Sequence, residues 1–135
     1  MRVLADTSAL LALHERRDQH HARAVAITQQ HRSVGGRYVG TLLVLSEFHS
    51  HLLYARGPRH AREALMALLG DPVHDWIAVS AGLAREAAAH WLARFADQDF
   101  SLADAVSFEV MQREKLTHAF AFDRHFEVAG FELLR

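Results

Sequence analysis

The sequence predicts an α/β fold in which helices cover both faces of a parallel sheet. Short apolar runs of strand length alternate with longer segments of helical periodicity along the chain. Two of these apolar runs end at an aspartate, Asp6 and Asp123. Half of the 135 residues are hydrophobic, which suffices for a core, so we expect one domain over 1–135.

The N-terminal half begins with an apolar run at 2–5, which predicts a buried strand ending at Asp6. The leucines that follow Asp6 have helical spacing. A second helix is expected over 18–32 and a weak strand over 37–40. A third helix is expected over 41–54, because its apolar residues fall on one stripe.

Gly57 and Pro58 interrupt this periodicity and end the third helix. The remaining elements are a helix, a strand, two helices and two strands, with expected bounds 59–69, 74–79, 81–96, 101–115, 119–122 and 131–134. The alternation of strands and helices therefore continues to the end of the chain.

The charge and composition exclude some classes of function. The formal net charge is −1, so the strongly basic footprint of a charge-driven nucleic-acid binder is absent. There are no cysteines, which excludes disulfides and thiolate chemistry. Asp6 interrupts the N-terminal apolar run, unlike a secretory signal, and no segment reaches membrane-spanning length. A cytoplasmic protein without membrane contact is expected.

Asp6 and Asp123 each follow a short buried run, so each is expected at the carboxyl end of a strand. In open parallel sheets, ligand-binding and catalytic residues lie in the crevice outside these carboxyl ends. A structural interpretation stays open for both: Asp6 as an N-cap of the next helix and Asp123 as a turn residue.

Two further acids lie on predicted helices. Glu47 is the only acid in the segment LLVLSEFHSHLL and lies beside apolar residues. It is either functional or paired with a nearby histidine or arginine. Asp104 follows Ser101 by three residues, as in a capping box, and a first-turn carboxylate can both cap and face a cation.

Four carboxylates in one pocket would repel one another unless a divalent cation lay between them. Ligands that are all oxygen suit Mg²⁺ or Mn²⁺ rather than zinc. The acidic residues together thus favour a metal-dependent site that acts on phosphate esters.

Four segments, in this order and spacing, resemble the PIN-domain family and in particular its VapC-like toxins: DTSALLAL at 6–13, LSEFHSHL at 45–52, DFSLADAVSFEVMQR at 99–113 and AFAFDRHFEVAGF at 119–131. The resemblance implies a three-layer α/β/α fold with a central parallel sheet of four to five strands. It also implies a Mg²⁺- or Mn²⁺-dependent endoribonuclease.

By this resemblance, Asp6 and Asp104 are the principal metal ligands, Glu47 is the helix-borne acid and Asp123 is the fourth, most variable acid. The supporting positions are Thr7, Ser8, Ser101 and Asp99. Water oriented by Glu47 or Asp123 would attack the phosphodiester in line, leaving a 5′-phosphate and a 3′-hydroxyl. A type II toxin of this kind implies an RNA substrate, a cognate antitoxin protein and a homodimer.

Two other classes of function are alternatives to this interpretation. A haloacid-dehalogenase-like phosphatase needs a second aspartate where Ser8 stands, and the only lysine, Lys115, ends a helix. A catalytically silent PIN-like module that binds RNA or docks a protein is the stronger alternative.

Most of the eleven histidines are expected to be solvated or bound to protein partners. His49 and His51 should not face together, and His20–His21 lies at a helix start. His125 is interpreted as structural.

Overall fold

Five parallel strands form the centre of the computed structural model, which describes residues 1–135. Their bounds are β1 Arg2–Ala5, β2 Arg37–Thr41, β3 His74–Ile77, β4 His118–Phe120 and β5 Glu132–Leu133. They form one sheet in the order β3–β2–β1–β4–β5, and every neighbouring pair is parallel. The predicted parallel α/β fold is confirmed.

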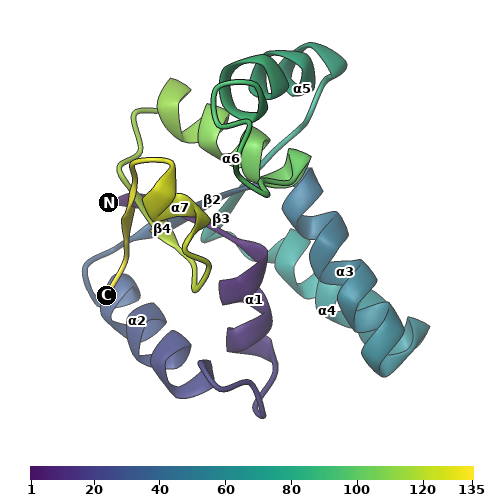
Figure 1. Cartoon of the computed structure of the whole chain (residues 1–135). Coiled ribbons are helices and arrows are strands. Elements are labelled where there is room, and N and C mark those ends of the chain that lie inside the picture. Colours follow the sequence, from purple (N-terminus) through teal and green to yellow (C-terminus); the bar gives the residue numbers. More distant parts are fainter.

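Helices connect successive strands and cover both faces of the sheet. They are α1 Thr7–His14, α2 His21–Ser33, α3 Leu42–Arg56, α4 Pro58–Gly70, α5 Ala81–Ala87, the π-helical turn η1 Ala88–Leu92, α6 Leu102–Arg113 and α7 His125–Val128. In Figure 1, α1 and α2 lie on one side of the strands and α5 and α6 on the other, while α3 and α4 extend outward as a pair.

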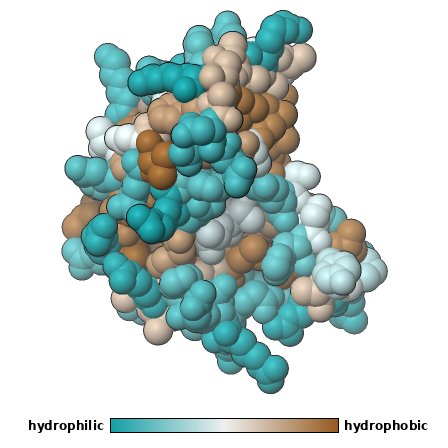
Figure 2. Space-filling view, viewed as in Figure 1, coloured by the Kyte–Doolittle hydropathy of each residue, from teal (hydrophilic) through white to brown (hydrophobic).

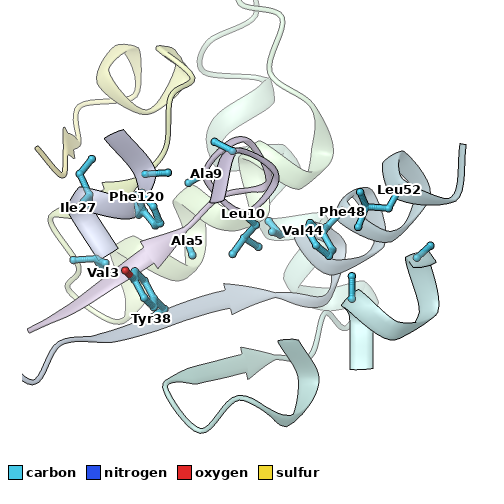
Figure 3. Close-up of a cluster of buried hydrophobic side chains, with 14 residues drawn as sticks. Val3, Ala5, Ala9, Leu10, Ile27, Tyr38, Val44, Phe48, Leu52 and Phe120 are labelled. Carbon is cyan, nitrogen blue, oxygen red and sulfur yellow. The ribbon is translucent and has the colours of Figure 1, made fainter. Parts of the chain in front are cut away.

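Alternation along the strands divides the core into two clusters. Val3 and Ala5 of β1 face one cluster, and Leu4 between them faces the other. Figure 3 shows the first cluster, where β1, β2 and α1 meet side chains of α3 such as Phe48. The second cluster lies under α6 and includes Phe108. The three-layer arrangement follows from burying both faces of the sheet.

The junction of α3 and α4 is formed as predicted. Gly57 has a φ of 89°, a left-handed conformation that L side chains rarely adopt, and it ends α3. Pro58 occupies the first position of α4. A backbone N–H at this position would have no hydrogen-bond partner within the helix, so a proline, which lacks the N–H, is tolerated there.

Some predicted strand bounds were wrong. The strand expected over 119–122 ends at Phe120, because the backbone N–H of Phe122 donates to Ser8 Oγ, 3.0 Å away, instead of extending the sheet. The strand expected over 74–79 ends at Ile77, and β5 is limited to Glu132–Leu133. Helix α7 was not predicted, because its four residues are too few to show helical periodicity.

The helix expected over 81–96 was only partly right. Its α-helical part ends at Ala87, and a π-helical turn continues to Leu92. In this turn His90 Nδ1 and Trp91 Nε1 lie 2.8 and 3.1 Å from the same buried oxygen, Oε1 of Glu109 on α6. The turn thus places two neighbouring side chains on one carboxylate.

No helix combines the length and the apolar character needed to cross a membrane. In Figure 2, hydrophilic residues cover most of the visible face, and hydrophobic residues are exposed mainly near the top, in the region of α5 and α6.

Candidate active site

A cleft of about 440 Å³ opens where β1 and β4 end. It is lined by Asp6, Thr7, Ser8, Leu11, Glu47, His51, Asp99, Ser101, Asp104, Asp123 and His125. The structure therefore brings together all four predicted acids and all four predicted supporting residues. They come from α1, α3, the start of α6 with the loop before it, and the segments after β1 and β4.

Asp6 connects the end of β1 to the start of α1. Its Oδ2 accepts hydrogen bonds from the Ser8 hydroxyl at 2.8 Å and the Ser8 backbone N–H at 3.3 Å, so it is the N-cap of α1. Asp6 also lines the cleft. The capping and cleft-lining interpretations are therefore both correct for this residue.

Glu47 projects from α3 toward the start of α1. Its Oε1 accepts a hydrogen bond of 2.9 Å from the Thr7 hydroxyl, which also lies 3.5 Å from the carbonyl oxygen of Val44. The alternative that Glu47 pairs with a histidine or arginine was wrong, since its partner is a neutral hydroxyl. Thr7 thereby fixes the carboxylate while its negative charge stays uncompensated.

Asp104 lies in the first turn of α6, where the predicted capping box is present. Ser101 Oγ accepts from the Asp104 backbone N–H, and Asp104 Oδ2 accepts from the Ser101 N–H, both at 3.0 Å. Because the box restrains the side chain, Asp104 is held at the edge of the cleft.

His125 joins two of the acids. Its Nδ1 lies 3.0 Å from Asp104 Oδ2 and 3.4 Å from Asp123 Oδ2, and its backbone N–H donates to Asp123 Oδ1 at 2.9 Å. His125 was expected to be structural, and its contacts with these acids were not predicted. The Asp-x-His spacing was the available signal, because an aspartate often accepts a hydrogen bond from the N–H two residues later.

His51 was not predicted as a cleft residue. It lies four positions after Glu47 on α3, and residues at this spacing share a helix face. His49 lines a separate groove between α3 and α4, so these two histidines do face apart.

Burial and mutual repulsion raise the pKa of two of the acids. Asp6 is only 6% exposed, and this desolvation raises its pKa from 3.8 to about 6 despite the hydrogen bonds from Ser8. Desolvation also raises the pKa of Glu47, with further contributions from the charges of Asp104 and Asp123. These couplings place the four carboxylates within one electrostatic site.

The raised pKa of Asp6 predicts how the stability of the metal-free protein depends on pH. Between pH 3.8 and about 6 the native state binds more protons at Asp6 than the unfolded state, so the unfolding free energy falls as pH rises. The loss is about 3 kcal/mol and is complete above the native pKa.

Urea unfolding at pH 4 and pH 7 of the wild type and of Asp6→Asn, both in chelator, measures this effect. The wild type should lose more stability than the variant over this interval. Parallel pH profiles for the two proteins would contradict the prediction.

The free oxygens of the site fit a hard divalent cation. The hydrogen bonds described above use Oε1 of Glu47 and Oδ2 of Asp104, which leaves the second oxygen of each of these two carboxylates without a hydrogen-bond partner. Oxygen donors of this kind are the ligands that Mg²⁺ and Mn²⁺ prefer. Lys115, which a dehalogenase-like phosphatase would need nearby, does not line the cleft.

A family model described as "PIN domain" matches residues 3–132. The chain belongs to the PIN-domain family. Among curated PIN-type relatives, the 23S rRNA-specific endonuclease VapC20 of Mycobacterium tuberculosis is 42% identical over 50 residues. That alignment covers 37% of this chain and 38% of the length of VapC20.

Solved structures extend the likeness over the whole PIN domain. The crystal structure of Mycobacterium tuberculosis VapC20, described as a sarcin–ricin loop cleaving toxin, matches with a TM-score of 0.81 and 30% identity. The match covers 96% of this chain and 95% of that one. VapBC2 from Rickettsia felis, bound to a DNA fragment from its promoter, matches with a TM-score of 0.70. It covers 98% of this chain and 97% of that one, and at 10% identity it shows the fold alone.

Proposed function

We propose that this PIN-domain protein is a metal-dependent endoribonuclease of the VapC type. The observation that carries the proposal is the convergence of Asp6, Glu47, Asp104 and Asp123, from four separate segments, on one cleft. The likeness to VapC20, a 23S rRNA-specific endonuclease, supports the choice of RNA as substrate.

Asp6 and Asp104 would be the principal ligands of Mg²⁺ or Mn²⁺, with Glu47 and Asp123 completing the site. A divalent cation held there would supply positive charge that stabilises the phosphate during hydrolysis. Ser8 and Ser101 orient Asp6 and Asp104 through the hydrogen bonds described above.

Glu47 is the carboxylate best suited to orient the attacking water and accept its proton. Thr7 holds Oε1, so Oε2 is the oxygen available for the proton. The raised pKa of Glu47 brings its proton affinity closer to what a general base needs near neutral pH. Asp123, held beside His125, is the other acid that could orient this water.

Cleavage of defined RNAs tests the proposal. The purified protein is incubated with a sarcin–ricin loop hairpin and with an unstructured RNA of equal length, in Mg²⁺, in Mn²⁺ and in EDTA. We expect cleavage only with metal, faster on the hairpin, and products with 5′-phosphate and 3′-hydroxyl ends. Equal cleavage in EDTA would exclude the metal mechanism. No cleavage of either RNA with Mn²⁺ would favour a catalytically silent module.

The VapC-type assignment also implies two protein partners, an antitoxin and a second copy of this chain. An antitoxin would neutralise the acidic cleft by placing a cationic side chain beside it, because the cleft is anionic without metal. Addition of such an antitoxin should stop RNA cleavage, and size-exclusion chromatography with light scattering measures whether the free protein is a homodimer.

A further inference from the structure

A second group of metal-ligating side chains lies outside the acidic cleft, where α1, α3 and α4 meet. His14 ends α1, Glu15 follows it, and His60 lies in the first turn of α4. The Nε2 atoms of His14 and His60 are 2.8 Å apart, although the residues are separated by 46 positions. One ligand atom from each of the three residues lies within 4.8 Å of the other two.

Hydrogen bonds within the protein do not satisfy every polar atom of this group. Arg56, the last residue of α3, pairs with Oε2 of Glu15, but Oε1 is buried without a hydrogen-bond partner. A buried polar atom without a partner destabilises a protein by about 1–3 kcal/mol. The two Nε2 atoms face each other, so one must carry a proton that the other accepts. A cation in this position would replace that proton and could also bind a carboxylate oxygen of Glu15.

The donor set indicates the class of cation. Two imidazole nitrogens and one carboxylate oxygen suit Zn²⁺ and similar transition metals, whereas Mg²⁺ and Ca²⁺ prefer oxygen alone. In a tetrahedral zinc site the two nitrogens would lie roughly 3.3 Å apart. His14 and His60 are both exposed, so their side chains are free to open by this small amount.

We propose that His14, Glu15 and His60 form a transition-metal site for Zn²⁺, separate from the acidic cleft, with a fourth position open to water. The three residues do not line the acidic cleft. Bound metal would tie the end of α1 to the start of α4, and Arg56 would hold Glu15 in place as a ligand. Since α1 begins with Asp6 as its cap, this site restrains the opposite end of the helix that borders the cleft.

Calorimetric titration of the purified full-length protein with Zn²⁺, and the visible absorption of added Co²⁺, test the proposal. We expect one strong site per chain and the absorption bands of tetrahedral Co²⁺. His14→Ala and His60→Ala should each weaken binding more than about 100-fold, beyond the loss usual for residues that only support a ligand. Glu15→Gln should weaken binding less, because it keeps one carbonyl oxygen.

Two controls separate this site from the proposed ribonuclease site. His49→Ala, which removes a histidine of the neighbouring groove, should bind Zn²⁺ like the wild type. The double variant Asp6→Asn/Asp104→Asn should also keep the strong site. Absence of a strong site, undiminished binding in His14→Ala and His60→Ala, or loss of binding in the acidic-cleft variant would each overturn the proposal. None of these outcomes depends on whether the protein cleaves RNA.

Discussion

Replacing Asp6 with asparagine should lower the rate of metal-dependent RNA cleavage by at least about 100-fold while the protein stays folded. The substitution removes one negative charge from the proposed metal site and changes the size of the side chain little. A cation that stabilises the reacting phosphate contributes several kcal/mol, and each 1.36 kcal/mol corresponds to about tenfold in rate. Single-turnover cleavage of the hairpin RNA in Mn²⁺ measures the change.

The fold should tolerate this substitution because asparagine is also a good N-cap. Its side-chain oxygen can accept the hydrogen bonds that Ser8 donates to Asp6. At pH 7 and without metal, the variant should be more stable than the wild type. The substitution removes the buried charge of Asp6, whose pKa is raised to about 6 by burial. Loss of activity together with a gain in stability would distinguish a functional carboxylate from a purely structural cap.

Asp97→Asn is the matched control, because Asp97 is exposed and does not line the cleft. It makes the same chemical change in the segment that precedes α6 and should leave the cleavage rate close to that of the wild type. If Asp6→Asn cleaves RNA as fast as Asp97→Asn, the proposed role of Asp6 is wrong.

Replacing Phe108 with alanine should lower the unfolding free energy by about 3–5 kcal/mol, the largest effect on stability that we expect from a single substitution. Phe108 on α6 is fully buried. Its ring centroid lies 5.3 Å from that of Trp91, 5.0 Å from Phe100 and 5.1 Å from Phe126. The cavity left by alanine would remove packing from three other segments at once.

Urea unfolding of the wild type and of the variant measures this loss. Tyr54→Ala is the control: it also removes an aromatic ring, but Tyr54 is 96% exposed on α3, so its stability should change by less than about 0.5 kcal/mol. Phe108→Leu, which keeps much of the buried volume, should fall between the two. A loss for Phe108→Ala as small as that for Tyr54→Ala would contradict the packing described here.

Much of the fold and the candidate site could be predicted from local patterns. The alternation of short apolar runs with helical segments predicted the parallel sheet, and Gly57 and Pro58 marked the junction of α3 and α4. An aspartate directly after a buried strand predicted the edge of the sheet where the cleft lies. These patterns can be detected in a single sequence because helix capping, turn formation and side-chain periodicity each involve only a few neighbouring residues.

The helical acids were harder to place. Periodicity could locate Glu47 beside an apolar stripe, but its hydrogen bond to Thr7 joins residues 40 positions apart. His125 was interpreted as structural, but no pattern in the sequence indicated that its Nδ1 lies 3.0 Å from Oδ2 of Asp104. The end of β4 at Phe120 likewise depends on a residue distant in sequence, since the backbone N–H of Phe122 donates to Ser8 Oγ.

The sequence by itself determined the fold class, the order of most elements and the identity of the acidic residues, because these depend on which residues are apolar, charged or able to cap. Only the tertiary structure decided which side chains meet across helices. The Nε2 atoms of His14 and His60 lie 2.8 Å apart because α1 and α4 pack against the same α3, and no local pattern in the sequence records how helices cross.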